Sequence, residues 1–184
     1  MMGENVILIG LPTAGKSTVG VVLAKQLGYD YIDTDLLIQQ QEGCRLEETI
    51  REKGEEAFLD IEAGVCSALQ RSRTVIATGG SVIYRTQAME HLKTLGTLVY
   101  LQIDLETLRE RLHDAAARGV VLKPGQTVEG LYRERIGLYE QYADLTVDES
   151  GKSFEDVVRA ILSALGTAPA PAIANDHQGY DCIS

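Results

Sequence analysis

Short apolar runs alternate with longer amphipathic segments between residues 5 and 165. A short apolar run bounded by turn residues is typical of a buried parallel strand, and apolar positions three or four residues apart are typical of a helix. These patterns predict strands at 5–9, 29–33, 74–78, 97–103 and 145–147. They predict helices at 18–27, 86–95, 105–113, 127–142 and 154–165, and over 36–69 with breaks near Gly43 and Gly54. Strands that alternate with helices indicate an α/β fold, with a five-stranded parallel sheet between two helical layers.

Two segments interrupt this alternation. Residues 115–126 contain Gly119, Pro124 and Gly125, which predict a loop rather than a continuous helix. Residues 166–184 carry Pro169 and Pro171 in a stretch rich in alanine and glycine, so we expect a disordered tail. Residues 1–165 are therefore predicted to form a single domain.

Composition narrows the classes of partner. The chain has 184 residues and a formal net charge of -10, so we expect no nucleic-acid partner, although a nucleotide can still bind where local geometry favours it. Its cysteines, Cys44, Cys66 and Cys182, are far apart, which favours reduced thiols in a cytoplasmic protein. The sequence shows no signal-peptide pattern and no apolar run long enough for a membrane helix, so we expect no membrane partner.

The sequence GLPTAGKST lies between the first predicted strand and the first predicted helix. It matches the phosphate-binding pattern G-x-x-x-x-G-K-[ST], in which backbone N–H groups and a helix N-terminus face phosphate oxygens. Lys16 is placed to reach the β- and γ-phosphates, and the Ser17 hydroxyl is placed to bind Mg²⁺. The alternative is an ordinary glycine-rich turn. The predicted nucleotide-binding residues are Gly10, Leu11, Pro12, Thr13, Ala14, Gly15, Lys16, Ser17 and Thr18.

Two further motifs follow predicted strands. Asp33 and Asp35 end the second strand, where carboxylates could hold Mg²⁺ through water and accept a proton from a substrate hydroxyl. The alternative is a solvated turn with Asp35 as a helix N-cap. Gly79 and Gly80 end the third strand, where glycines let a substrate approach the backbone closely, unless they form a plain turn.

Taken in order, GLPTAGKSTVG, the aspartate pair, GEEAF at 54–58, ATGGSV at 77–82 and RERIGLYEQYAD at 133–144 resemble shikimate kinase. The resemblance covers about residues 6–165. It implies a three-layer P-loop NTPase fold of the nucleoside-monophosphate-kinase-like type, with a mobile lid at about 115–126. It also implies ATP, Mg²⁺ and phosphorylation of the shikimate 3-hydroxyl, and we expect a monomer.

The resemblance also implies roles for individual residues. Asp35 resembles the carboxylate that contacts the substrate hydroxyls, and Asp33 resembles the one near Mg²⁺. Gly79 and Gly80 resemble the substrate-binding glycines, and Arg135 resembles the arginine that holds the substrate carboxylate. Arg118 resembles the lid arginine that reaches the transferred phosphate. The predicted catalytic residues are Lys16, Asp35 and Arg118; the predicted metal ligands are Ser17 and Asp33.

The sequence departs from the family pattern at several positions. Leu59 stands where the family has a second carboxylate-binding arginine, and Ser81 stands where it has a third glycine. The lid sequence is Arg-Gly-Val-Val, where the family has Arg-Pro-Leu-Leu. Glu62 matches the glutamate beside the missing arginine, or is a helix-surface charge. Two alternatives therefore stay open: a kinase of the same fold for another small hydroxy acid or polyol, and a non-catalytic nucleotide-binding protein.

Overall fold

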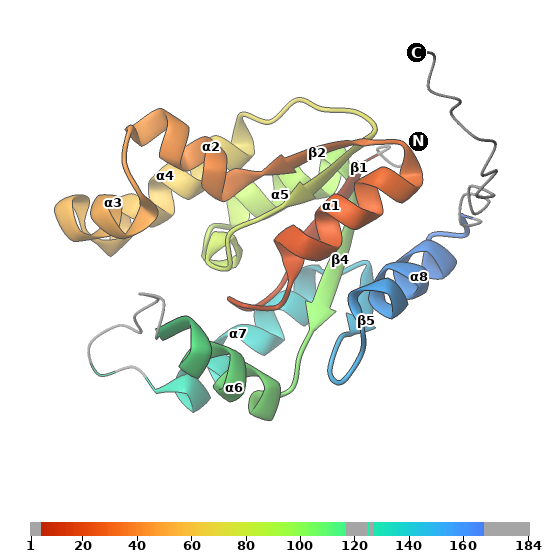
Figure 1. Cartoon of the computed structure of the whole chain (residues 1–184). Helices are drawn as coiled ribbons and strands as arrows, with labels where there is room; N and C mark the ends of the chain where they lie inside the picture. The colour runs from red at the N-terminus through yellow and green to blue at the C-terminus, as the bar shows by residue number, and fades with distance from the viewer. Residues whose placement is uncertain (1–4, 117–124, 126, 168–184) are drawn as a thin grey trace, which may run out of the picture.

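Five parallel strands form the centre of the computed structural model, which describes residues 5–116, 125 and 127–167 (Figure 1). The strand order is β2-β3-β1-β4-β5, and each neighbouring pair is parallel. All five residues of the central strand β1 are buried, as its continuous apolar run predicts. The strands are β1 Asn5–Ile9, β2 Asp30–Asp33, β3 Thr74–Ala77, β4 Gly96–Gln102 and β5 Leu145–Asp148.

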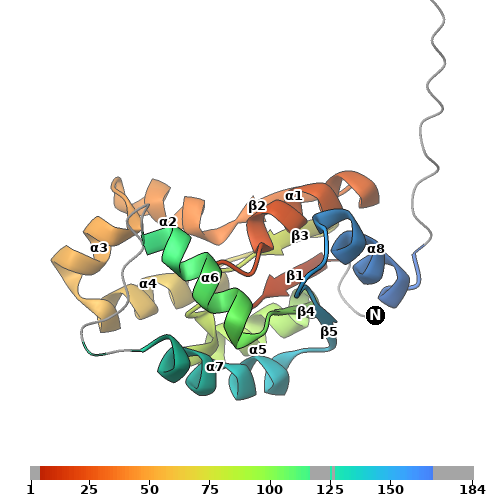
Figure 2. The same cartoon turned by 60° about the horizontal axis from the view of Figure 1, so that its bottom comes forward.

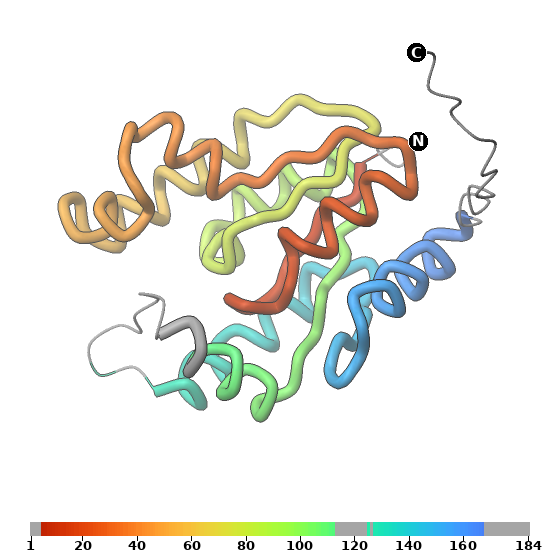
Figure 3. Tube along the Cα trace, in the orientation of Figure 1, coloured from red at the N-terminus to blue at the C-terminus, as the bar shows by residue number. Residues whose placement is uncertain are grey.

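Helices cover both faces of this sheet. Figure 2 shows α1 on one side and α5 and α7 on the other, and Figure 3 follows the chain through the turn that joins β1 to α1. In this described part of the chain no helix has the length and apolar character needed to cross a membrane. The helices are α1 Lys16–Leu27, α2 Thr34–Glu42, α3 Leu46–Lys53, α4 Glu55–Ser67, the 3₁₀ turn η1 Val82–Tyr84, α5 Thr86–Leu95, α6 Leu105–Ala116, α7 Val128–Tyr142 and α8 Phe154–Ala164.

The three-layer fold with a five-stranded parallel sheet is confirmed, and several element bounds differ from the prediction. Helix α1 begins at Lys16 rather than residue 18, because Gly15 takes the left-handed N-cap conformation with φ 71°. The breaks at Gly43 and Gly54 divide 36–69 into three helices. Helix α6 continues to Ala116, so the first two residues of the predicted loop are helical. The rest of that loop, apart from Gly125, and the tail from residue 168 lie outside the described residues.

Hydrogen bonds between the strand ends bring the sequence motifs to one edge of the sheet. The Thr78 hydroxyl donates to the Leu8 carbonyl at 3.0 Å, which ties the end of β3 to the end of β1. The Gly79 amide donates to Thr34 Oγ1 at 3.1 Å, which ties the glycine turn to the start of α2. Because the strands are parallel, their carboxyl ends meet there, as expected of a ligand site in this fold class.

Candidate active site

Lys16 lies at the centre of this edge, in the first turn of α1. The side chain is buried, and Nζ donates to the carbonyl oxygens of Gly10 and Leu11, each at 2.8 Å. Burial lowers the pKa of Lys16 to about 8, and the nearby Asp35 carboxylate opposes that shift. The loop thus closes around its own ammonium group, which is placed to meet an anionic ligand.

A buried ion pair supports the loop from outside. Glu149, just after β5, is fully buried and pairs with Arg111 of α6. Arg111 Nη1 also donates to the Thr13 carbonyl at 3.0 Å. A Cβ on Gly15 would lie 3.1 Å from both Glu149 carboxylate oxygens, so the glycine permits this close approach. The phosphate-binding pattern itself did not reveal Arg111 or Glu149.

Ser17 and Asp33 meet beside the loop. The Ser17 hydroxyl donates to Asp33 Oδ2 at 2.7 Å, and the Tyr31 hydroxyl donates to the same oxygen at 3.2 Å. Asp33 Oδ1 accepts the Asp35 backbone N–H at 3.0 Å, which makes Asp33 the N-cap of α2. The alternative that placed the cap at Asp35 is therefore wrong.

Asp35 lies in the first turn of α2, so it is helical rather than the end of an extended segment. Burial raises the pKa of Asp35, the Asp33 charge raises it further, and the Lys16 ammonium opposes the shift. Near a substrate hydroxyl, a carboxylate with a raised pKa would be a better proton acceptor than an ordinary one.

The glycine turn packs against a buried acid. Glu62 of α4 has 1% of its surface exposed, and Oε2 accepts a hydrogen bond of 2.7 Å from the Ser81 hydroxyl. A Cβ on Gly79 would lie 1.9 Å from Glu62 Oε1 and 2.9 Å from Asp35 Oδ1. Only a glycine at position 79 leaves room for these two carboxyl groups. The alternative of a helix-surface charge for Glu62 is wrong.

Arg135 of α7 reaches the same turn from the other side. It is buried, and Nη1 donates to the Gly80 carbonyl at 3.2 Å. Its guanidinium lies 5.1 Å from the centre of the Tyr84 ring, and Nε donates to the Tyr84 hydroxyl at 3.0 Å. The Tyr139 hydroxyl donates to the Gly80 carbonyl at 2.6 Å. These contacts hold Arg135 against the second glycine of the turn.

The structure therefore brings together Lys16, Asp33, Asp35, Gly79, Gly80 and Arg135 from four separate segments of the sequence. Arg118 lies outside the described residues, so its position in the site stays a prediction. The sequence analysis did not identify Ser81, Tyr84 and Tyr139 as structural partners of these residues. The sequence could have pointed to them through their position beside a motif. Ser81 and Tyr84 follow the glycine pair, and Tyr139 lies four residues after Arg135.

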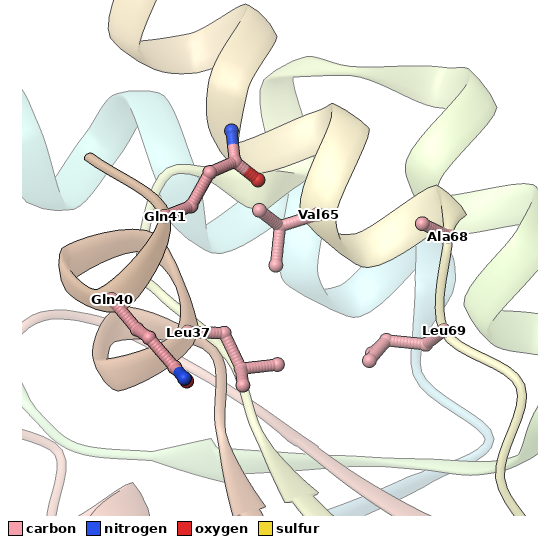
Figure 4. A pocket seen from close by; sticks show the side chains of 6 residues that line it. All are labelled: Leu37, Gln40, Gln41, Val65, Ala68 and Leu69. Carbon is pink, nitrogen blue, oxygen red and sulfur yellow. The ribbon is translucent and has the colours of Figure 1, made fainter. Parts of the chain in front are cut away.

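A separate groove of about 410 Å³ lies between α2 and α4 (Figure 4). Leu37 and Val65 face it from the two helices, and Gln40 and Gln41 lie at its α2 side. None of the residues that line this groove belongs to the loop or to the glycine turn. We therefore assign the groove no part in the chemistry of the site.

The strand order, together with a phosphate-binding loop after the central strand, defines a P-loop kinase of the nucleoside-monophosphate-kinase-like class. The shikimate kinase family model matches residues 12–166. The chain belongs to the shikimate kinase family.

Individual relatives agree with this assignment. The chain is similar to a shikimate kinase of Persephonella marina, with 34% identity over 163 residues, 88% of this chain and 99% of the relative. It is similar in structure to the shikimate kinase of Acinetobacter baumannii in complex with shikimate, with a TM-score of 0.81, 31% identity and coverage of 89% and 93% of the two chains. The shikimate kinase of Aquifex aeolicus gives a TM-score of 0.78, 33% identity and coverage of 88% and 96%.

The buried position of Lys16 predicts that Lys16→Ala lowers phosphoryl transfer by about 100-fold or more, because the ammonium is placed to stabilise charge on the transferred group. The variant is expected to keep its fold, since the lost partners are two loop carbonyls. Lys25→Ala, at an exposed position in the last turn of the same helix, is the matched control and is expected to keep its turnover. An ADP-release assay and circular dichroism measure both properties, and near-wild-type turnover of Lys16→Ala would contradict the role of the loop.

Burial raises the pKa of Glu62 to about 7, so folding and protonation of this residue are linked. The folded protein keeps the proton up to about pH 7, whereas the unfolded chain releases it near the ordinary value of about 4.3. The protonated carboxyl group therefore stabilises the fold fully below about pH 4. This contribution falls as the pH rises and is lost once the pH passes about 7. Relative to wild type, Glu62→Gln should gain about 3–4 kcal/mol over that interval.

Urea denaturation of both proteins between pH 4 and pH 8 measures this difference. The control is Glu56→Gln on the same helix, where the side chain is 83% exposed and a change of less than about 0.5 kcal/mol is expected. A constant stability difference between Glu62→Gln and wild type across the range would show that Glu62 titrates as an ordinary surface acid.

Proposed function

We propose that this protein transfers the γ-phosphoryl group of ATP to a hydroxyl of shikimate, the 3-hydroxyl in the family pattern. The observation that carries the proposal is the convergence of Lys16, Asp35 and Arg135 around the Gly79–Gly80 turn. A phosphate-binding cation, a proton acceptor and a carboxylate-binding guanidinium are the groups that phosphorylation of a hydroxy acid requires. Family membership supports shikimate as that hydroxy acid.

The residues beside the loop suit Mg²⁺. The Ser17 hydroxyl and the Asp33 carboxylate are oxygen donors 2.7 Å apart, and oxygen donors are the ligands that Mg²⁺ prefers. We propose that these two residues hold the ion, Asp33 through water. When bound, Mg²⁺ neutralises charge on the β- and γ-phosphates.

The chain's own residues would then position the reactants. The loop amides and Lys16 bind the phosphates, and Arg135 binds the substrate carboxylate in a planar, charge-assisted contact. Asp35 orients the attacking hydroxyl and accepts its proton. Most of the rate enhancement would come from positioning and electrostatics, as phosphoryl transfer needs little covalent help from the protein. The role of Arg118 at the transferred phosphate stays a prediction from the family pattern.

We also propose that the protein acts as a cytoplasmic monomer without a nucleic-acid partner. The net charge of -10 supports the absence of a polyanionic partner. Cys44 and Cys66, the cysteines within the described residues, are free thiols, which is consistent with a reducing compartment.

One observation favours a second candidate, a kinase for another small hydroxy acid or polyol. Leu59 is 5% exposed on α4, one turn before Glu62, so an apolar side chain fills the position of the family's second arginine. Arg85 does not replace that arginine, because its guanidinium pairs with Glu56 and Asp60 on the outside of the protein. A substrate carboxylate would therefore rely on Arg135 for its guanidinium contact.

Leu59→Arg separates the two candidates. If shikimate is the substrate, the new guanidinium gives a second contact with its carboxylate and lowers the shikimate KM about tenfold or more, from about 1.5–3 kcal/mol per charge-assisted bond. If the substrate is another molecule, the arginine buries an unpaired charge beside it and damages the natural activity. ADP release by both proteins with shikimate and a panel of hydroxy acids and polyols measures the difference.

Val21→Arg, at a position of α1 that is 53% exposed, controls for the added charge and is expected to leave KM unchanged. The absence of wild-type turnover with shikimate at high concentration, together with turnover of another compound in the panel, would replace the first candidate with the second.

A further inference from the structure

One buried acid has no part in the mechanism described so far. The Glu62 side chain is enclosed between α4 and the glycine turn, and Ser81 donates to Oε2. Among the described residues, Oε1 has no hydrogen-bond partner. The oxygen lies against Gly79, the residue that forms the floor of the proposed substrate site, on the same side as Asp35 Oδ1. A buried polar atom without a partner costs about 1–3 kcal/mol, so its position needs a reason.

The surroundings of Glu62 decide which protonation state it favours. The groups that act on it are Asp35 from α2, Lys16 from α1 and Arg135 from α7, while Cys66 lies one turn along its own helix. Tyr139 of α7 and Tyr84 of η1 contact the turn through Gly80 and Arg135. Burial raises the pKa of Glu62 to about 7, and the Asp35 charge adds to the shift, while the Ser81 hydroxyl and the two cations oppose it. The acid therefore titrates near neutral pH and holds its proton below about pH 7.

Ser81 orients this acid. When its hydroxyl donates to Oε2, a proton on the carboxyl group lies on Oε1, the oxygen that faces the turn. A glycine at position 81 has no hydroxyl and could not impose this choice. At position 59 the chain has an apolar side chain, which offers no donor to an anion. Both departures from the family pattern are thus near one glutamate: Ser81 contacts it, and Leu59 precedes it by three residues on α4.

We propose that Glu62 recognises the substrate's carboxylate as a neutral acid, with Ser81 donating to Oε2 and the Oε1 hydroxyl donating to the carboxylate. The proposal rests on the proposed function, since it assumes an anionic substrate over the Gly79–Gly80 turn. Glu62 and Arg135 then hold the carboxylate together, and the acid proton takes the place of the second guanidinium. At a pH where Glu62 is ionised in the free protein, Glu62 takes up one proton from solvent when the substrate binds.

This arrangement makes affinity depend on pH. The substrate carboxylate stays ionised above about pH 5, so its own charge does not change near neutrality. As the pH rises through 7, the unbound protein loses the Glu62 proton and must regain it to bind. The shikimate KM of wild type should therefore rise about tenfold between pH 6 and pH 8 at saturating ATP.

The test measures KM and kcat for shikimate from pH 6 to pH 8 in wild type and Glu62→Gln. The amide accepts from Ser81 and donates through its N–H₂ group at every pH, so this variant should show a KM that changes less than about twofold. Glu56→Gln on the same helix is the matched control and should keep the wild-type pH profile. A flat wild-type profile, or the same rise in Glu62→Gln as in wild type, would overturn the proposal.

Calorimetry of shikimate binding provides a second readout that needs no variant. Titrations at pH 8 in two buffers of different ionisation enthalpy should give an uptake of close to one proton per substrate bound by wild type. Proton uptake without turnover would support the role of Glu62 and contradict the proposed function. Turnover without proton uptake would support the proposed function and overturn the role of Glu62.

Discussion

The site depends on the burial of one ammonium group. Lys16 donates to the carbonyls of Gly10 and Leu11, and this closes the loop that follows the central strand. A buried cation is costly unless it is hydrogen-bonded and has anions nearby, so the fold must supply both. Asp33 at the end of β2 and Asp35 in the first turn of α2 provide the negative charge, and Arg135 adds a second cation. The acidic motifs and the loop are therefore parts of one electrostatic unit.

The glycine turn is the second constraint, because it determines how closely those charges approach. A side chain at position 79 would collide with Glu62 and Asp35, so the turn is where α2 and α4 bring their acids together. Arg135 and Tyr139 both donate to the Gly80 carbonyl, which fixes α7 against the same turn. A ligand on this turn would contact groups from α2, α4 and α7 at once. This shared contact explains how single changes at positions 59 and 81 could alter recognition without altering the fold.

Much of this architecture could be predicted from the sequence. The sequence pattern predicts the five strands, most clearly the buried strands β1, β3 and β4, whose residues are mainly apolar, and the loop motif identifies Lys16 and Ser17. Helix ends are harder to predict: α1 begins at Lys16 only because Gly15 adopts a left-handed conformation. The burial of Glu62 had no local signal. It depends on Ser81, 19 residues away, and on the absence of a side chain at Gly79. Two partners of Arg135, Tyr84 and Gly80, are likewise more than 50 residues distant.

The central claim is that the phosphoryl group passes to a substrate hydroxyl over the glycine turn, and ³¹P NMR of the full chain with ATP, Mg²⁺ and shikimate tests it most directly. The account predicts that the γ-phosphate signal is replaced by a phosphate monoester signal that is coupled to the ring proton at carbon 3. The inorganic phosphate signal should stay at the level of a sample without shikimate. Loss of the γ-phosphate signal to inorganic phosphate alone, or no loss of it at all, would contradict the account.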